Sequence, residues 1–186
     1  MRTLRLSHIA LIACLLTPMA AVAKPAPDAP TQAAPAVRAG DDFPGAEDPD
    51  SAFDKIIRHE LPASRVYEDA DVLVFLSNKP FVAGHALVIS KTSHARSLIA
   101  MPPEAMAKIM AAARRVMIAQ RRVLGATGAL IISANGTEQT VPHLHVHVIP
   151  TKPGDSAVGI LSNHAAMTGP EIDALAARLA AAMPAR

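Results

Sequence analysis

The stretch that decides the fold is Gln139–Pro150, which reads QTVPHLHVHVIP. Apolar and histidine side chains alternate along it, and successive side chains of a strand point to opposite faces of a sheet. This alternation predicts a strand over residues 141–149. One face would pack into the core through Leu144, Val146 and Val148, and the other would carry His143, His145 and His147. Neighbouring histidines would then lie about 6–7 Å apart.

Three imidazoles on one face of a strand indicate chemistry more than structural filler. Each neutral ring carries one donor and one acceptor, which both need partners when the ring is buried. Two kinds of site use such rings. Neutral imidazoles bind zinc, and an imidazole nitrogen can attack phosphorus to form a covalent intermediate. The three residues alone leave both kinds of site open.

Further elements follow on both sides of this stretch. We expect a short helix near 53–57, a long helix from Pro102 to Leu124 that stops at Gly125, and a final helix over 171–182. The other predicted strands cover 66–68, 72–76, 85–90 and 130–133. This order of helix, strands, helix, strands and helix predicts an α+β domain with a mainly antiparallel sheet of about five strands and two main helices.

The first 23 residues have the pattern of a secretory signal peptide. Arg2 and Arg5 form a basic start, and Leu6–Leu16 is mostly apolar but too short to span a bilayer. Ala21-Val22-Ala23 is a small-residue cleavage site, so we expect a cut after Ala23 and a periplasmic or secreted protein. Leu11–Cys14 is similar to a lipobox. The alternative to a cut after Ala23 is therefore a lipoprotein that is lipidated at Cys14.

The remaining chain divides into three predicted parts. Residues 24–48 are a flexible linker rich in proline and alanine, residues 49–155 a folded domain, and residues 156–186 an extension with an amphipathic helix.

Cleavage of the signal peptide also changes the charge balance. Without Arg2 and Arg5, 16 of the 18 basic side chains remain against 16 acidic ones. This balance argues against nucleic-acid or anionic-membrane partners. The only cysteine, Cys14, is removed with the signal peptide. The sequence contains no uninterrupted apolar run of 18 residues, so stable membrane insertion is not expected.

Residues 139–150 resemble the motif of the histidine triad (HIT) family, His-φ-His-φ-His-φ-φ, where φ is apolar. The similarity continues upstream. The segment KIIRHELPASRVYEDADVLVFL resembles the first helix and hairpin of the family, and Gly84–Ile89 resembles its Gly-His-x-Leu-Val-Ile strand. His94 and Ser97-Leu98 match the loop that follows.

The resemblance implies a HIT-like fold, a homodimer, and a nucleotide-like phosphorylated substrate. The implied activity is that of a hydrolase or nucleotidyl transferase, which cleaves phosphoanhydride or phosphoramide bonds through a covalent nucleotidyl-histidine intermediate. His145 is similar to the family's nucleophile, with His143 orienting it and His147 contacting the phosphate or the departing group. His85 occupies the place of a fourth active-site histidine.

The resemblance also implies substrate contacts. Thr140 matches a position that holds phosphate oxygens, and Gln139 and Asn135 match polar contacts near the leaving group. Ser77 aligns with an aspartate that holds the ribose hydroxyls, and a serine accepts from two hydroxyls less well than a carboxylate.

No metal or cofactor is expected. Zinc in some relatives is held with a Cys-x-x-Cys pair, and here Ser51 and Asp54 occupy those places. His59, His94 and His164 are interpreted as solvent-facing or structural residues. Two other functions remain open on sequence grounds. One is a module that binds nucleotides or phosphates without turnover, and the other is a periplasmic metal-binding protein that uses the triad.

Overall fold

The computed structural model describes residues 38, 40–43 and 47–185. The predicted signal peptide (1–23) and most of the predicted linker (24–48) lie outside these residues. Within the described part, no helix is both long enough and apolar enough to cross a membrane.

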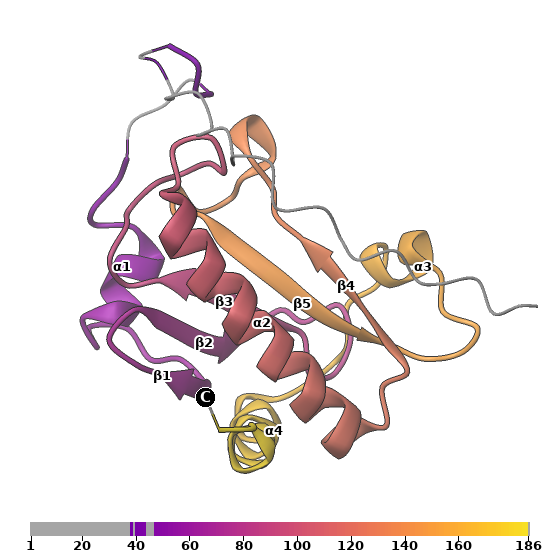
Figure 1. Cartoon of the computed structure of the whole chain (residues 1–186). Coiled ribbons are helices and arrows are strands. Elements are labelled where there is room, and N and C mark those ends of the chain that lie inside the picture. Colours follow the sequence, from indigo (N-terminus) through magenta and orange to yellow (C-terminus); the bar gives the residue numbers. More distant parts are fainter. Residues whose placement is uncertain (1–37, 39, 44–46, 186) are drawn as a thin grey trace, which may run out of the picture. The chain divides into compact units, whose positions relative to one another are not determined.

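One five-stranded sheet organises the domain, and each pair of neighbouring strands in it is antiparallel (Figure 1). Along the sheet the order is β1-β2-β3-β5-β4. The strands are β1 (Arg65–Glu68), β2 (Val72–Leu76), β3 (Ala86–Ser90), β4 (Gly128–Ile132) and β5 (His145–Thr151). The predicted α+β class with a mainly antiparallel sheet of five strands is confirmed.

The helices pack around this sheet. They are α1 (Ala52–Ile57), α2 (Pro103–Leu124), α3 (Ala157–Leu161) and α4 (Gly169–Ala182), and a 3-10 turn, η1 (Gly136–Glu138), precedes the triad. Proline begins α2, and Gly125 ends it in the left-handed region at φ 65°, as the sequence predicted. The short helix α3 was not predicted. Its start is held by Ser156, whose hydroxyl accepts from the backbone N–H of Gly159.

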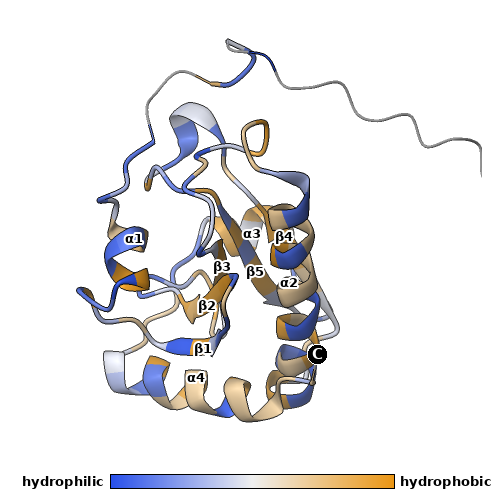
Figure 2. Cartoon of the chain, turned by 60° about the vertical axis from the view of Figure 1, so that its left-hand side comes forward, coloured by the Kyte–Doolittle hydropathy of each residue, from blue (hydrophilic) through white to orange (hydrophobic). Residues whose placement is uncertain are grey.

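The two faces of the sheet are both covered. On one face, apolar side chains from β2, β3 and β5 pack against α2 and α4. On the other, Leu73, Phe75, Leu87 and Ile89 pack with Phe53 and Ile56 from α1. Figure 2 shows apolar strands in the middle, with α1 on one side of the sheet and α2 on the other. Because side chains alternate along each strand, the residues of β5 divide between these two layers.

The strand that carries the triad is shorter at its start than predicted. It begins at His145 instead of Val141. Pro142 has no backbone N–H for a ladder, and the N–H of Leu144 donates to the carbonyl of Ala95 in a loop, at 2.8 Å. The three histidines therefore do not share one strand face. His145 and His147 lie on β5, whereas His143 precedes the strand and is fully buried.

Candidate active site

Three imidazole rings meet at one face of the sheet, on the side covered by α1. His145 and His147 are two residues apart on β5, where they pair with Ile89 and Leu87 of β3, and their ring centroids are 4.9 Å apart. His85 comes directly before β3, and its Nε2 lies 2.8 Å from Nδ1 of His147. The fold thus brings the predicted fourth histidine to the third residue of the triad.

The backbone around His85 and His147 is held from the opposite face of the sheet. Gln120 of α2 is fully buried, and its Nε2 donates to the carbonyls of Gly84 and Val148, at 3.0 Å each. Gly84 has a φ of +88°, and a Cβ added there would lie 2.4 Å from Leu124 Cδ1. Only glycine meets both conditions easily.

Hydrogen bonds assign the protons of His85 and His147. The backbone N–H of Phe81 donates to Nδ1 of His85 at 3.3 Å, so that nitrogen carries a lone pair. A neutral His85 then has its proton on Nε2 and donates it to Nδ1 of His147. A neutral His147 consequently carries its proton on Nε2, where no described residue accepts it.

His145 is held in the opposite tautomer. Its Nδ1 lies 2.8 Å from the backbone carbonyl of His143. A carbonyl only accepts, so Nδ1 carries the proton and Nε2 keeps the lone pair. The described residues offer no hydrogen-bond partner to that Nε2. The site thus places an imidazole with a free lone pair beside one that offers an N–H donor.

Burial keeps these rings neutral at physiological pH. It lowers the pKa of His85 to about 4, with smaller contributions from His145 and His164. It also lowers the pKa of His147 to about 3, helped by the charges of His145 and His85. The pKa of His145 is lowered too. Burial is the main cause. The hydrogen bond that His145 donates to the His143 carbonyl opposes it, and the His143 ring lowers the pKa of His145 further.

An apolar cavity of about 720 Å³ adjoins this cluster. Its walls come from α1, the loop after it, and strands β2 and β3, and include Phe53, Ile56, Phe75, Leu87 and Val141. The Phe53 ring stands edge-on to the His145 ring, with centroids 5.0 Å apart. No histidine lines the cavity, so the cavity adjoins the cluster through Phe53, which lines the one and contacts the other.

The other predicted site residues lie around the cluster with different partners. The Ser77 N–H donates to the carbonyl of His85 at 3.0 Å, and its hydroxyl accepts from the N–H of Lys79. Asn78, not Ser77, lines the cavity. Thr140 is exposed on the bend before the triad.

Asn135 and Gln139 brace a loop instead of projecting freely. Asn135 Oδ1 accepts from the N–H of Leu98 at 2.6 Å, and Gln139 Nε2 donates to the carbonyl of Arg96 at 2.6 Å. Both side chains thereby fix the loop that runs beside the triad.

Sequence reasoning did not assign a role to Asp54, which the structure buries against the triad. This carboxylate reaches His143 and also His94, which is therefore not simply a solvent residue. Donor atoms of Asp54, His94 and His143 lie within 4.8 Å of one another, the one such candidate metal-holding group among the described residues. Ser51 and Asp54, at the cysteine positions of zinc-binding relatives, were the available signal.

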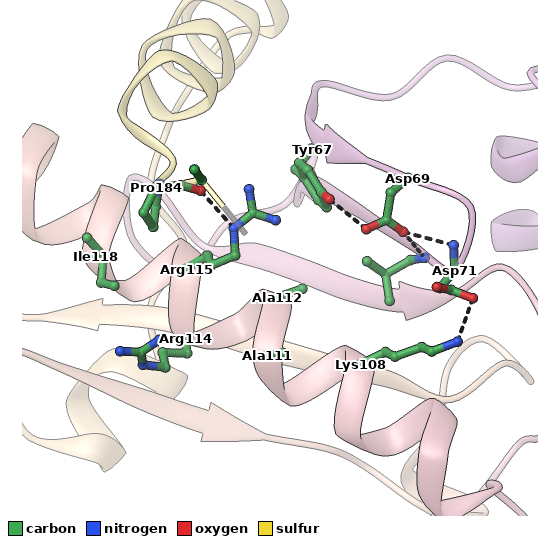
Figure 3. A pocket seen from close by; sticks show the side chains of 12 residues that line it. Tyr67, Asp69, Asp71, Lys108, Ala111, Ala112, Arg114, Arg115, Ile118 and Pro184 are labelled. Carbon is green, nitrogen blue, oxygen red and sulfur yellow. Dashed lines mark hydrogen bonds and ion pairs between the residues drawn. The ribbon is translucent and has the colours of Figure 1, made fainter.

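A second cavity, of about 510 Å³, lies on the α2 side of the sheet, away from the histidines (Figure 3). Polar groups around it already pair with one another. Lys108 binds Asp71 at 2.7 Å, and Tyr67 donates to Asp69 at 2.6 Å. Arg115 donates to the carbonyl of Pro184 at 2.9 Å. These side chains are engaged with one another, whereas the histidine cluster has a lone pair without a partner among the described residues, so the histidine cluster is the better candidate site.

Comparisons with known proteins point to the same cluster. The family model described as the HIT domain matches residues 58–154, which include His85 and the triad residues His143, His145 and His147. An uncharacterised HIT-like protein of Mycobacterium tuberculosis is 41% identical over 105 residues, covering 55% of this chain and 72% of the relative. Adenosine 5'-monophosphoramidase hnt1 of Schizosaccharomyces pombe is 31% identical, covering 58% of this chain and 79% of that protein.

A solved structure is similar over the domain. The zinc-bound histidine triad family protein of Mycobacterium smegmatis superposes with a TM-score of 0.62 and 34% identity, over 72% of this chain and 92% of that one.

Proposed function

Because this chain belongs to the HIT domain family, we propose that it is a hydrolase that cleaves nucleotide-like phosphoanhydrides or phosphoramides through a covalent intermediate on His145. The observation that carries the proposal is the pair of opposite tautomers at 4.9 Å. His145 offers a lone pair at Nε2, and His147 offers an N–H donor beside it. Nucleophilic substitution at phosphorus needs both an attacking pair and a donor for the developing charge.

The first half of the reaction forms a bond between Nε2 of His145 and the α-phosphorus. The bond from phosphorus to the leaving atom breaks, and its electron pair departs with that atom. A leaving phosphate oxygen departs as the anion, and a leaving nitrogen takes up a proton from solvent and departs as the amine. The Nε2–H of His147 donates a hydrogen bond to the phosphoryl group or leaving atom and keeps its proton, because a neutral imidazole is a very weak acid. The intermediate is cationic, and its Nδ1–H remains on the carbonyl of His143.

Water completes the second half. It attacks phosphorus, the bond from phosphorus to Nε2 breaks, and the electron pair returns to His145. One proton of the water passes to solvent, and a nucleoside monophosphate is released. The enzyme regains its starting tautomers, so this sequence requires no metal at the phosphorus.

The apolar cavity supports a nucleoside as the group transferred. Phe53, Ile56 and Phe75 give it apolar walls of the kind that hold a base, and one of these side chains, Phe53, also contacts the His145 ring. The phosphoramidase activity named for the fission-yeast relative is consistent with this substrate class. Assays with different substrates would identify the preferred nucleobase and show whether the leaving group is an amine or a phosphate.

The test is hydrolysis of a fluorogenic adenosine phosphoramidate and of a diadenosine polyphosphate, without added metal, by protein lacking residues 1–23. His145→Ala should abolish turnover of both. His59→Asn is a matched control, because His59 is exposed and has a φ of 62°, which asparagine tolerates. Turnover that survives in His145→Ala would refute the mechanism. Tight nucleotide binding without turnover by the unchanged protein would indicate a binding module.

A homodimer is part of the proposal. β4 lies at one edge of the sheet, and a groove between it and α2 is lined by residues that include Met117, Arg121 and Gly128. Met110, Met117 and Ile131 expose about 40% of their area in the single chain. A second copy covering this face would bury that apolar area.

Export is also proposed. Its support is the signal pattern in residues 1–23, which lie outside the described part of the structure. A periplasmic or secreted location is checked by fractionating cells that express the full-length chain. The N-terminus of the exported protein should begin at Lys24.

A further inference from the structure

The apolar cavity beside the histidine cluster has a polar end, where β1 begins and β2 finishes. Its lining there includes Ser64 just before β1, Asn78 just after β2, and Asp173 of α4. Among the described residues that line the cavity, Asp173 carries the one carboxylate, and no lysine, arginine or histidine accompanies it. A cavity with this lining favours the uncharged part of a nucleotide over its phosphates.

The carboxylate of Asp173 is positioned by the sheet. Its Oδ1 accepts a hydrogen bond from the Ser64 hydroxyl at 2.5 Å. The Ser64 carbonyl in turn accepts from the backbone N–H of Leu76 at 2.9 Å, so Ser64 is tied to the end of β2. No described residue donates to Oδ2 of Asp173. One oxygen is therefore fixed by the protein, and the other is available to a ligand.

The packing of α4 brings Asp173 to the cavity. Ile172 and Leu175 are buried on one side of the helix, in the same apolar layer as side chains of β1 and β2. Figure 2 shows α4 beside β1. The backbone N–H of Thr168 donates to the Glu171 carboxylate at 2.7 Å, which closes the first turn of the helix. Because α4 is both packed and capped, the direction of Asp173 is set before a ligand arrives.

A nucleoside needs acceptors as well as apolar walls. Its N–H and O–H groups lose free energy if they leave water without a new partner. Phe53 lines the cavity and contacts the His145 ring, so a nucleotide bound with its α-phosphorus at His145 can extend its nucleoside into the cavity. A carboxylate oxygen only accepts. Oδ2 of Asp173 therefore selects a donor, which is an amino group of the base or a hydroxyl of the ribose.

We propose that Asp173 is a specificity-determining residue, which accepts a hydrogen bond from the nucleoside of the substrate while Ser64 positions it. This inference rests on the proposed function. Ser77, the predicted ribose contact, does not line the cavity. Asp173 lies beyond residues 58–154, which match the family model, so the C-terminal helix adds a substrate contact to the domain. A nucleoside without a donor at this point binds less tightly, because the carboxylate loses water and gains no partner.

The test is the affinity for nucleoside monophosphates, measured by calorimetry on the full-length protein. The probes are AMP, its analogue without the 6-amino group, and 2′,3′-dideoxy-AMP. Asp173→Ala should weaken the binding of AMP by about tenfold, as expected for one hydrogen bond to a charged group. The analogue that lacks the recognised donor should bind the unchanged protein about tenfold less tightly than AMP, and Asp173→Ala should weaken it no further. The amino-free probe behaves in this way if Asp173 contacts the base, and the dideoxy probe if it contacts the ribose.

Glu104→Ala is the matched control. It also removes an exposed carboxylate from the beginning of a helix, and Glu104 does not line the cavity. Its affinity for AMP should equal that of the unchanged protein. Ser64→Ala should weaken AMP binding less than Asp173→Ala does. The double variant should bind AMP as Asp173→Ala does, because Ser64 acts through Asp173.

Three outcomes would overturn the proposal. They are an unchanged affinity for AMP in Asp173→Ala, an equal loss for AMP and both analogues in that variant, and a failure of AMP to bind the unchanged protein. Alanine favours helices, so Asp173→Ala should keep α4 folded. The binding measurements need no turnover. If His145→Ala retains activity, the proposed covalent mechanism fails, while the contact of Asp173 with the nucleotide is still decided by calorimetry.

Discussion

The low pKa values of the active-site histidines predict a rate that persists into acid. At pH 5.5 an imidazole with its ordinary pKa of about 6.5 is about 90% protonated, whereas one with a pKa of about 4 is about 3% protonated. His85 has a pKa of about 4, and His147 has one of about 3. The pKa of His145 is lowered as well, so the attacking lone pair also persists below pH 6.5. We therefore expect kcat/KM, which reports the free enzyme, to fall between pH 7.5 and 5.5 by less than it would with an imidazole nucleophile of ordinary pKa.

The assay uses a dinucleoside polyphosphate, because its internal phosphates do not titrate in this range. An ordinary imidazole nucleophile would be about 90% free base at pH 7.5 and about 10% at pH 5.5, a fall of roughly tenfold. A half-maximal rate near pH 6.5 in the unchanged protein would refute the reasoning. His85→Ala admits water to the His147 ring, so the acid limb should move toward pH 6.5 in that variant. The His59→Asn control should keep the profile of the unchanged protein.

Three further predictions concern stability, specificity and assembly. Gly84→Ala should lower the free energy of unfolding by about 1–3 kcal/mol in chemical denaturation, since φ is +88° and the new Cβ meets Leu124; unchanged stability would contradict the assignment of that conformation. Ser77→Asp can accept from Lys79 with one oxygen and leave the other for ribose, so KM for a ribonucleotide should fall by roughly tenfold, as a charge-assisted hydrogen bond implies. The KM of the dideoxy analogue should not fall, and an equal change for both would count against ribose recognition. Met117→Lys should shift the protein from dimer to monomer in sedimentation, and a monomeric unchanged protein would remove the dimer proposal.

Strands and long helices could be predicted from the sequence because each follows a local pattern. Val72–Leu76 and Ala86–Ser90 are short apolar runs between turn residues, and Pro103–Leu124 has helical periodicity with proline at its start and Gly125 at its end. These patterns depend on residues close together in the sequence, and the structure contains the elements that they predict. The short helix at Ala157–Leu161 has only one turn and one buried residue, so its pattern was too weak to detect.

The alternation of histidines predicted the cluster but not its arrangement. Period two would place His143 beside His145 and His147, whereas Pro142 and the Leu144–Ala95 hydrogen bond delay the strand by four residues. The partner of His143 then becomes Asp54, which is 89 residues away along the chain. Contacts at that separation depend on how α1 packs across the sheet. Ser51-x-x-Asp54 was visible in the sequence as a replacement for cysteines, but its hydrogen bonds were not.

The four active-site histidines show why spacing alone does not determine what an imidazole can do. Each ring is the same group, and its protons follow from the acceptors that face it. His143 lies between the Asp54 carboxylate and the Ser90 carbonyl, and His145 faces one carbonyl and retains a lone pair. His85 receives a backbone N–H and therefore passes its own proton toward His147. A substitution that exchanges an acceptor for a donor should consequently change the chemistry as much as removing a histidine. Asp54→Asn would do this behind His143, and it leaves every residue of the triad motif in place.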